Sequence, residues 1–183
     1  MAKVYAMIAD GTEEVECLAV VDVLRRAGIE TVLVSAMDRL DVVSSHNIRI
    51  QADAAVSEVD FSDADVIFLP GGMPGSEHLS GCAPLIRALE AQNAVGKRIA
   101  AICAAPAVVL GRHGFLRGKE AICFPGFEEE LVGAVLSKSK VVTDGNITTA
   151  KGVGVALDLG LELVRLLKDW ETAEDLKRKI QYA

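Results

Sequence analysis

Short apolar runs alternate with longer amphipathic segments along most of this chain. A short apolar run bounded by Gly, Pro or Asp is typical of a buried strand, whereas apolar residues three or four apart over a longer segment are typical of a helix. Strands are therefore predicted at Val4–Ala9, Glu30–Ala36, Asp65–Leu69 and Arg98–Ile102. Helices are predicted over about Glu13–Ala27, over about fifteen residues ending near Asn93, over about Gly154–Lys168 and in the charged terminal segment Thr172–Ala183.

The remaining segments show weaker patterns. Polar and apolar residues alternate from Asp41 to Ala52, which predicts a strand pair or hairpin. A short strand is predicted around Ala121–Phe124, followed by an acidic helical turn in "FEEEL", and a second strand pair is predicted around Val141–Ala150.

Strands that alternate with helices predict a doubly wound α/β fold, in which a mostly parallel sheet is covered on both faces to give three layers. Hydrophobic residues make up 51% of the chain and aromatic residues only 4%, so Ala, Val, Leu and Ile must fill the core. This composition suits helices packed on a buried sheet. No linker, repeat or low-complexity segment interrupts the pattern, and residues 1–183 are expected to form a single domain.

Charge and cysteine usage narrow the function classes. The net charge of −7 argues against nucleic acid or an anionic membrane surface as a partner, and no apolar run has the length of a membrane span. The four cysteines are far apart, without a C-x-x-C pair, so neither a metal site nor a cofactor is expected. The first residues do not form a signal peptide, which predicts reduced thiols in the cytoplasm.

Three unusual loops follow three of the predicted strands. They are "DGTEEVE" after the first strand, "PGGMPGS" after Asp65–Leu69 and "CAAP" after Arg98–Ile102. Ligands bind beyond the carboxyl ends of the strands in such sheets, so these loops are expected to converge on one site.

Cys103 lies where a strand turns directly into a helix. This arrangement is typical of a nucleophile elbow, in which a reactive side chain is held on a strained turn. The free N–H groups and the dipole of the following helix are expected to favour the thiolate. The alternative is that Cys103 simply packs in the core, as most free cysteines do.

Glu16 is the candidate partner of Cys103. On a helical wheel it lies with Val20 and Val23 on the core-facing side, whereas Glu14 lies on the polar side. Burial raises the pKa of a carboxyl group and allows it to donate a hydrogen bond. The alternative is an acid that complements the helix dipole, which suits Glu13 and Glu14; Glu13 stays open as a second candidate.

Two adjacent glycines, Gly71 and Gly72, follow a predicted strand. Their N–H groups are candidates for an oxyanion hole beside Cys103, although a plain Gly-Gly turn is the commoner explanation. The histidines fall in predicted surface strands or loops, and none is adjacent to the cysteine: they are His46, His78 and His113. The sequence therefore predicts no Cys–His dyad.

The segments "GTEEVE", "VDVLRRAGI", "DVIFLPGG" and "IAAICAAPAVVL", in this order and spacing, resemble the ThiJ/PfpI superfamily. The resemblance covers nearly the whole chain and is strongest to the parkinsonism-associated deglycase-like branch, whose members often carry the name thiazole-monophosphate biosynthesis protein. It implies a flavodoxin-like sandwich and a homodimer. It also implies an oxidation-sensitive nucleophile at Cys103, a protonated glutamate at Glu16 and backbone donors at Gly72 and Ala104.

The chain departs from that superfamily at four places. Phe124 stands where many relatives carry a histidine, and Ala104 stands where the peptidase branch has one. The segment Gly152–Val155 reads "GVGV" in place of "GPGT", and His46 replaces an arginine that relatives contribute from the partner subunit. These departures affect the expected substrate range more than the Cys–Glu pair.

Two functions are therefore expected. The first is a cofactor-free, cysteine-dependent glyoxalase or deglycase that acts on reactive aldehydes and dicarbonyls or their adducts. The second is a redox-responsive protective or chaperone-like protein, since an activated thiolate is also readily oxidised to sulfenic and sulfinic acid. A cysteine peptidase or amidotransferase is the third alternative, disfavoured by the missing dyad histidine.

Overall fold

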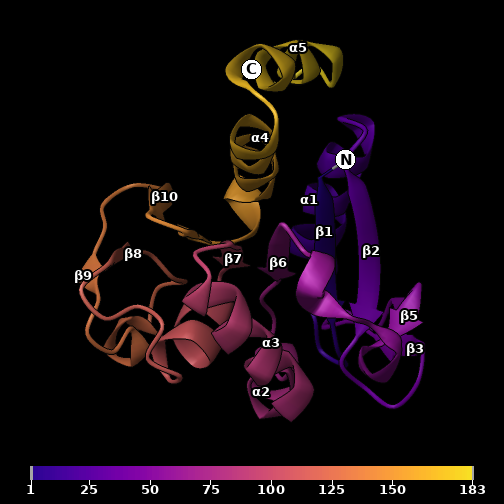
Figure 1. The fold of residues 1–183 in the computed structure, drawn as a ribbon, viewed down its shortest axis with the longest axis vertical. Helices are drawn as coiled ribbons and strands as arrows, with labels where there is room; N and C mark the ends of the chain where they lie inside the picture. The colour runs from indigo at the N-terminus through magenta and orange to yellow at the C-terminus, as the bar shows by residue number, and fades with distance from the viewer. Residues whose placement is uncertain (1, 183) are drawn as a thin grey trace.

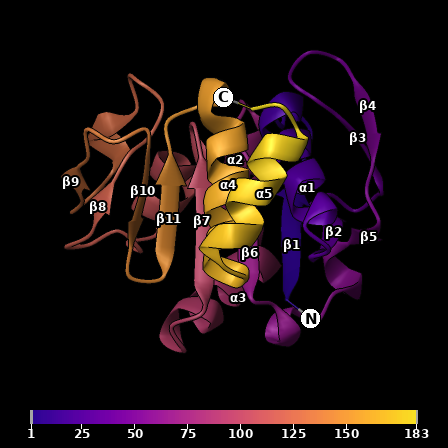
Figure 2. The same ribbon diagram turned by 90° about the horizontal axis from the view of Figure 1, so that it is seen from above.

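The computed structural model describes residues 2–182, so Met1 and Ala183, the ends of the predicted domain, lie outside the described residues. Its main sheet contains β1 (Lys3–Ile8), β2 (Glu30–Ser35), β5 (Ala54–Ala55), β6 (Val66–Leu69), β7 (Arg98–Ile102), β10 (Val141–Asp144) and β11 (Ile147–Ala150). The strands lie in the order β10-β11-β7-β6-β1-β2-β5 (Figure 2). All pairs are parallel except β10 with β11, which confirms the mostly parallel sheet and the predicted pair at its edge.

Helices cover both faces of this sheet. One side carries α1 (Glu14–Arg26), α4 (Ala156–Leu167) and α5 (Trp170–Lys179), and the other carries α2 (Gly75–Gly81), α3 (Ala83–Ala94) and a π-helix, η3 (Pro106–Gly111). Figure 1 shows α1 and α4 on the opposite side of the sheet from α2 and α3. The strands β2, β1, β6, β7 and β11 follow the 2-1-3-4-5 order of flavodoxin-like folds. The predicted doubly wound, three-layer sandwich is confirmed.

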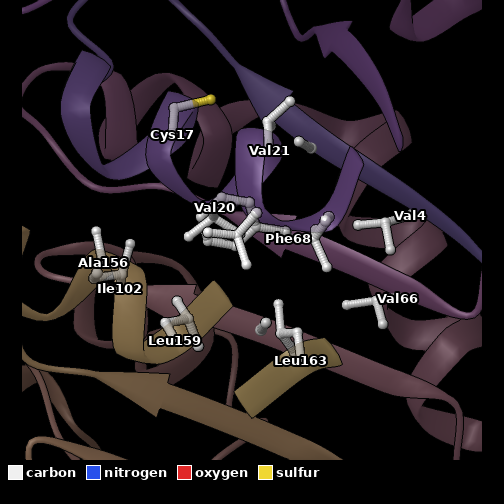
Figure 3. Packing of buried hydrophobic residues seen from close by; sticks show 14 of the residues in the cluster. Val4, Cys17, Val20, Val21, Val66, Phe68, Ile102, Ala156, Leu159 and Leu163 are labelled. Atoms are coloured by element: carbon white, nitrogen blue, oxygen red, sulfur yellow. The ribbon is translucent and has the colours of Figure 1, made fainter. Parts of the chain in front are cut away.

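The core between α1, α4 and the sheet consists of close-packed aliphatic side chains. Val20 of α1 and Leu159 of α4 meet over Phe68 of β6, and all three are fully buried (Figure 3). Gly160 permits this approach, since a Cβ atom there would lie 3.0 Å from Val23. The helices are therefore held against the sheet by shape as well as by apolar burial.

Two predicted helices differ from the structure. The predicted helix ending near Asn93 is divided into α2 and α3 at Cys82, whose backbone is extended and whose side chain is buried, not on a surface helix. Pro84 explains the division, because it lacks the N–H group that would continue the helical hydrogen bonds from α2. The helix after Cys103 is only the six residues of η3.

The smaller elements follow the predictions with shifted bounds. The hairpin between Asp41 and Ala52 is confirmed as β3 (Asp41–Val43) and β4 (Arg49–Gln51), and the acidic turn is the 3-10 helix η4 (Glu128–Glu130). The strand predicted at 121–124 is β8 (Glu120–Ala121), which pairs with β9 (Val135–Leu136), a strand that was not predicted.

The two C-terminal helices also shift. A 3-10 turn, η5 (Val153–Val155), precedes α4, and α5 begins earlier than predicted because the Asp169 carboxylate accepts a hydrogen bond from the Thr172 N–H. Within residues 2–182, no helix combines the length and the apolar character that crossing a bilayer requires.

Candidate active site

The loops that follow β1, β6 and β7 meet at the carboxyl edge of the sheet, as predicted. The Glu13 N–H donates a hydrogen bond of 2.9 Å to the Gly71 carbonyl, which joins the first loop to the second. Gly71 also lies against the third loop, since a Cβ atom there would be 2.5 Å from the Cβ atom of Cys103. The chain proceeds from β1 to one side of the sheet and from β6 to the other, so this edge is the topological switch point of the fold.

Cys103 adopts a strained conformation at the end of β7. Its φ angle of 65° lies in the left-handed region, which is uncommon for a residue with a Cβ atom. Two backbone hydrogen bonds hold it there: its N–H donates to the Ala150 carbonyl at 2.9 Å, and its carbonyl accepts from the Phe124 N–H at 2.8 Å. The partly exposed side chain thus stands on a nucleophile-elbow turn.

Glu16 lies in the first turn of α1 and is 1% exposed, as its helical phase predicts. The Gly71 N–H donates to its Oε2 atom at 3.0 Å, and the Val153 N–H and the Cys103 thiol face the carboxylate. Burial raises the pKa of Glu16 to about 7, against the opposing effect of these donors. A protonated and an ionised Glu16 therefore coexist near neutral pH.

The expected lowering of the Cys103 pKa is wrong for the thiol beside an ionised Glu16. Burial first, and then the charge and the hydrogen bond of Glu16, raise the pKa of Cys103 to about 12. The Gly72 and Ala104 N–H groups lower it, but they are outweighed. The helix-dipole argument failed because it ignored the burial of the sulfur and the carboxylate beside it.

Once Glu16 is ionised, Glu16 and Cys103 together hold one proton that either side chain can carry. If the proton moves from sulfur to Glu16, the carboxylate charge next to the sulfur disappears and the new O–H donates to the thiolate. The Gly72 and Ala104 N–H groups then add two further donors to the thiolate. The arrangement can therefore present a nucleophile and a proton carrier in direct contact.

The predicted backbone donors have different partners. The Gly71 N–H is bonded to Glu16, whereas the Gly72 and Ala104 N–H groups face the sulfur of Cys103. Gly71 also has to be a glycine, because a Cβ atom would lie 2.6 Å from Glu16 Oε2 and 3.0 Å from Cys103 Sγ.

The other cysteines and two of the histidines lie apart from this pair. Burial raises the pKa of Cys17 to about 12 and that of Cys123 to about 11, and Cys82 is likewise buried. His78 lies in α2, not in a strand or loop as predicted, and His113 bonds to Ser80.

The His46 side chain contacts the start of α1. Its Nδ1 atom is 3.0 Å from Glu14 Oε1, and the Ser45 hydroxyl lies 3.2 Å from Glu14 Oε2. Glu14 is therefore buried, and its prediction as a residue of the exposed face is wrong because the hairpin covers this end of the helix. Glu13 completes a group whose ligand atoms lie within 4.8 Å of one another. Contacts with the protein itself account for these carboxylates, since His46 lies against Glu14 and Glu13 accepts the Glu16 N–H as the helix cap.

Val153 is a site residue whose contact with Glu16 the sequence reasoning missed. Its N–H faces the Glu16 carboxylate from the turn after β11. The position of the "GVGV" segment could have predicted this contact. The segment follows a strand that neighbours β7, so it lies at the same edge of the sheet as Cys103.

Comparisons with known proteins agree with this architecture. The DJ-1/PfpI family model matches residues 2–166. Protein DJ-1 homolog B of Arabidopsis thaliana is 39% identical over 175 residues, which cover 95% of this chain but 40% of that protein. Protein dj-1beta of Drosophila melanogaster is 33% identical over 97% of this chain and 95% of its own length. This chain thus spans less than half of the Arabidopsis relative and nearly all of the Drosophila one.

One relative carries an enzymatic name, and solved structures share the fold. The glutathione-independent glyoxalase DJR-1.2 of Caenorhabditis elegans is 30% identical over 93% of this chain and 91% of its own length. The structure of oxidized DJ-1 from Toxoplasma gondii superimposes with a TM-score of 0.97 at 37% identity, covering 100% of both chains. From the matched family model, these relatives and the shared fold, the chain belongs to the DJ-1/PfpI family.

Proposed function

We propose that this protein is a cofactor-free enzyme that converts 2-oxoaldehydes to 2-hydroxy acids, with Cys103 as nucleophile and Glu16 as proton carrier. The contact between the Cys103 thiol and a buried carboxyl group whose pKa is about 7 carries this proposal. A general acid–base group is most effective when its pKa lies near the working pH. The glyoxalase activity in the name of the Caenorhabditis elegans relative supports the same reaction class.

The reaction proceeds without an external oxidant or reductant. Proton transfer to Glu16 leaves the Cys103 thiolate, which attacks the aldehyde carbon; a C–S bond forms and the carbonyl electron pair becomes an oxyanion. The proposal assigns the stabilisation of this oxyanion to the Gly72 and Ala104 N–H groups, which face the sulfur, and Glu16 returns its proton to it.

The resulting hemithioacetal then rearranges. The Glu16 carboxylate removes the proton from the former aldehyde carbon and delivers it to the neighbouring ketone carbon, while the hydroxyl proton of the first carbon passes to the ketone oxygen of the second. The first carbon is thereby oxidised and the second reduced. The product is a thioester of a 2-hydroxy acid on Cys103. Water hydrolyses the thioester, so one water is consumed, the 2-hydroxy acid leaves and the thiol is restored. The same nucleophile serves adducts of dicarbonyls, which is the deglycase form of the proposal.

The test is the consumption of methylglyoxal with the formation of lactate. Replacement Cys103→Ser is expected to abolish both, and Glu16→Gln is expected to lower kcat by about 10²–10⁴-fold, the usual contribution of general acid–base catalysis. Cys82→Ser is the matched control, because this cysteine lies outside the site, and it is expected to retain activity. Undiminished lactate formation by Cys103→Ser would refute the proposed function.

A second candidate function, redox sensing, is favoured by the exposure of the cysteines. Cys103 is partly exposed, whereas Cys17, Cys82 and Cys123 are buried. Its thiolate would attack hydrogen peroxide to form a sulfenate and release water, and a second peroxide would give the sulfinate. The Glu16 O–H and nearby N–H groups would stabilise the sulfinate. Mass spectrometry after mild peroxide treatment should find oxidation confined to Cys103; equal oxidation of all the cysteines contradicts this function.

We further propose that the protein acts as a homodimer of single-domain subunits, residues 1–183, in the reducing cytoplasm. Exposed apolar side chains on α1 and the β3–β4 hairpin support the dimer, with exposed fractions of 38–52%: Val15, Leu18, Val43 and Ile48. His46 lies on the same hairpin with 69% of its side chain exposed, and we propose that it meets the partner subunit. Analytical ultracentrifugation should find a dimer that dissociates in Leu18→Glu; a monomeric wild-type protein contradicts this arrangement.

A further inference from the structure

An apolar groove begins at the two residues whose backbones hold the reacting pair. The Phe124 N–H bonds to the Cys103 carbonyl at 2.8 Å, and the Val153 N–H faces the Glu16 carboxylate. The side chains of Phe124 and Val153 form the walls of one groove of about 260 Å³. The groove is therefore lined by residues whose backbones adjoin the proposed active site.

The lining of this groove is almost entirely apolar. Pro125 and Val155 complete the walls, Gly152 and Gly154 leave space between them, and Lys151 lies at the rim. Gly152 is packed against the ring of Phe124, since a Cβ atom there would lie 3.2 Å from Cδ2. The ring is thus supported on one side, while Phe124 as a whole stays partly exposed.

The exposed surface of these walls requires an explanation. Phe124 is 45% exposed and Val153 is 47% exposed, although both stand at the rim of the site. Apolar surface next to polar catalytic groups is typical of a ligand pocket, in which the polar groups act on the substrate and the apolar walls bind its remainder. A cavity of about 150 Å³ accommodates benzene, so this groove has room for one aromatic ring or a branched alkyl chain.

We propose that the preferred substrates are 2-oxoaldehydes whose ketone carbon carries a bulky apolar substituent, an aryl or branched alkyl group, and that Phe124 and Val153 bind this substituent. This inference rests on the proposed function. The bond between the aldehyde carbon and Cys103 Sγ fixes one end of the substrate. The substituent on the neighbouring ketone carbon then lies against the side chains of Phe124 and Val153. Methylglyoxal, whose substituent is a single methyl group, leaves most of the groove empty.

The expected preference follows from the area that the groove removes from water. A single methylene group in a hydrophobic pocket changes discrimination by about 10–200-fold. Because this groove is open to solvent on one side, the lower end of that range applies. Wild-type protein should therefore show a kcat/KM for phenylglyoxal about tenfold above that for methylglyoxal.

The test compares the ratio of these two kcat/KM values in wild type, Phe124→Ser and Val153→Ser. Comparing this ratio between variants removes the difference in intrinsic reactivity between the two dicarbonyls. Two groove variants are used so that the test remains possible if one of them does not fold. Val95→Ser is the matched control, since Val95 is 70% exposed at the end of α3, away from the groove. We expect the ratio to fall about tenfold in each groove variant, the lower end of the same range, and to be unchanged in the control.

Three outcomes are distinguishable. A high wild-type ratio that falls in the groove variants supports the inference. Turnover of methylglyoxal with a ratio near one, or with a ratio that neither groove variant changes, overturns the inference and leaves the proposed function intact. Turnover of neither dicarbonyl by folded wild-type protein overturns the proposed function and the inference that rests on it.

Discussion

Replacing Glu16 by Gln should make the protein more stable at neutral and alkaline pH, by an amount that depends on pH. Gln keeps the shape of the protonated acid, and its amide oxygen can still accept from the Gly71 and Val153 N–H groups. It removes only the carboxylate, whose burial raises the pKa from 4.5 to about 7. The variant thus measures how strongly the fold opposes that charge.

The magnitude follows from the two pKa values. The folded state holds the Glu16 proton more tightly than the unfolded state, so this contribution to stability is fully present below pH 4.5 and is lost as the pH rises through 7. A difference of about 2.5 between the pKa values, at about 1.36 kcal/mol per pKa unit, corresponds to about 3 kcal/mol. About 2 kcal/mol of this falls between pH 5.5 and pH 8, a range that avoids the isoelectric point near 5.0.

The assay is urea unfolding of wild type and Glu16→Gln at several pH values in that range, under reducing conditions. The free energy of unfolding of wild type relative to the variant should fall by about 2 kcal/mol from pH 5.5 to pH 8. Titration of the thiols in the unfolded state changes the free energy of unfolding of both proteins equally, so it cancels in the difference between them. If the difference between the two proteins is constant across this range, Glu16 is not the titrating group and the reasoning about the pair is wrong.

Three glycine substitutions test the packing around the site and the core. Gly71→Ala places a Cβ atom 2.5 Å from Cys103 Cβ. The substitution should lower the free energy of unfolding in urea by about 1–3 kcal/mol and abolish dicarbonyl turnover. Retained activity would show that the loop adjusts freely. Gly160→Ala, whose Cβ atom would lie 3.0 Å from Val23, should also destabilise the protein by about 1–3 kcal/mol. Gly81→Ala, with nothing within 4 Å, should stabilise it by about 0.5–1 kcal/mol; equal effects of these last two would contradict the close packing of α1 on α4.

The strands were predicted well because each is a continuous apolar run. β7 has its predicted bounds, β2 and β6 differ from theirs by one residue at one end, and β1 differs by one residue at each end. The two-residue strands β5 and β9 were missed because their pairing depends on distant partners and not on a local pattern. Pro84 was a visible signal for the break between α2 and α3, and the prediction overlooked it.

The same contrast between local and distant interactions separates the features of the site that were predicted from those that were not. The helical phase of Glu16 is a local property and was predicted correctly, and so was the turn at Cys103. The burial of Glu14 depends on a hairpin tip that lies more than thirty residues later in the chain, since Ser45 and Glu14 are separated by 31 positions. The pKa of Cys103 depends on Glu16 across an even longer separation. Both errors came from judging a residue by its own segment alone.

The turn at Cys103 depends on parts of the chain that are synthesised late. The carbonyl that accepts the Cys103 N–H belongs to Ala150, and the N–H that meets Glu16 belongs to Val153. A nascent chain that has emerged only as far as β7 lacks both partners, so its cysteine is an ordinary thiol on an unsupported loop. The site therefore comes into existence only when β11 has paired beside β7, and incompletely synthesised chains should lack the reactivity proposed for Cys103.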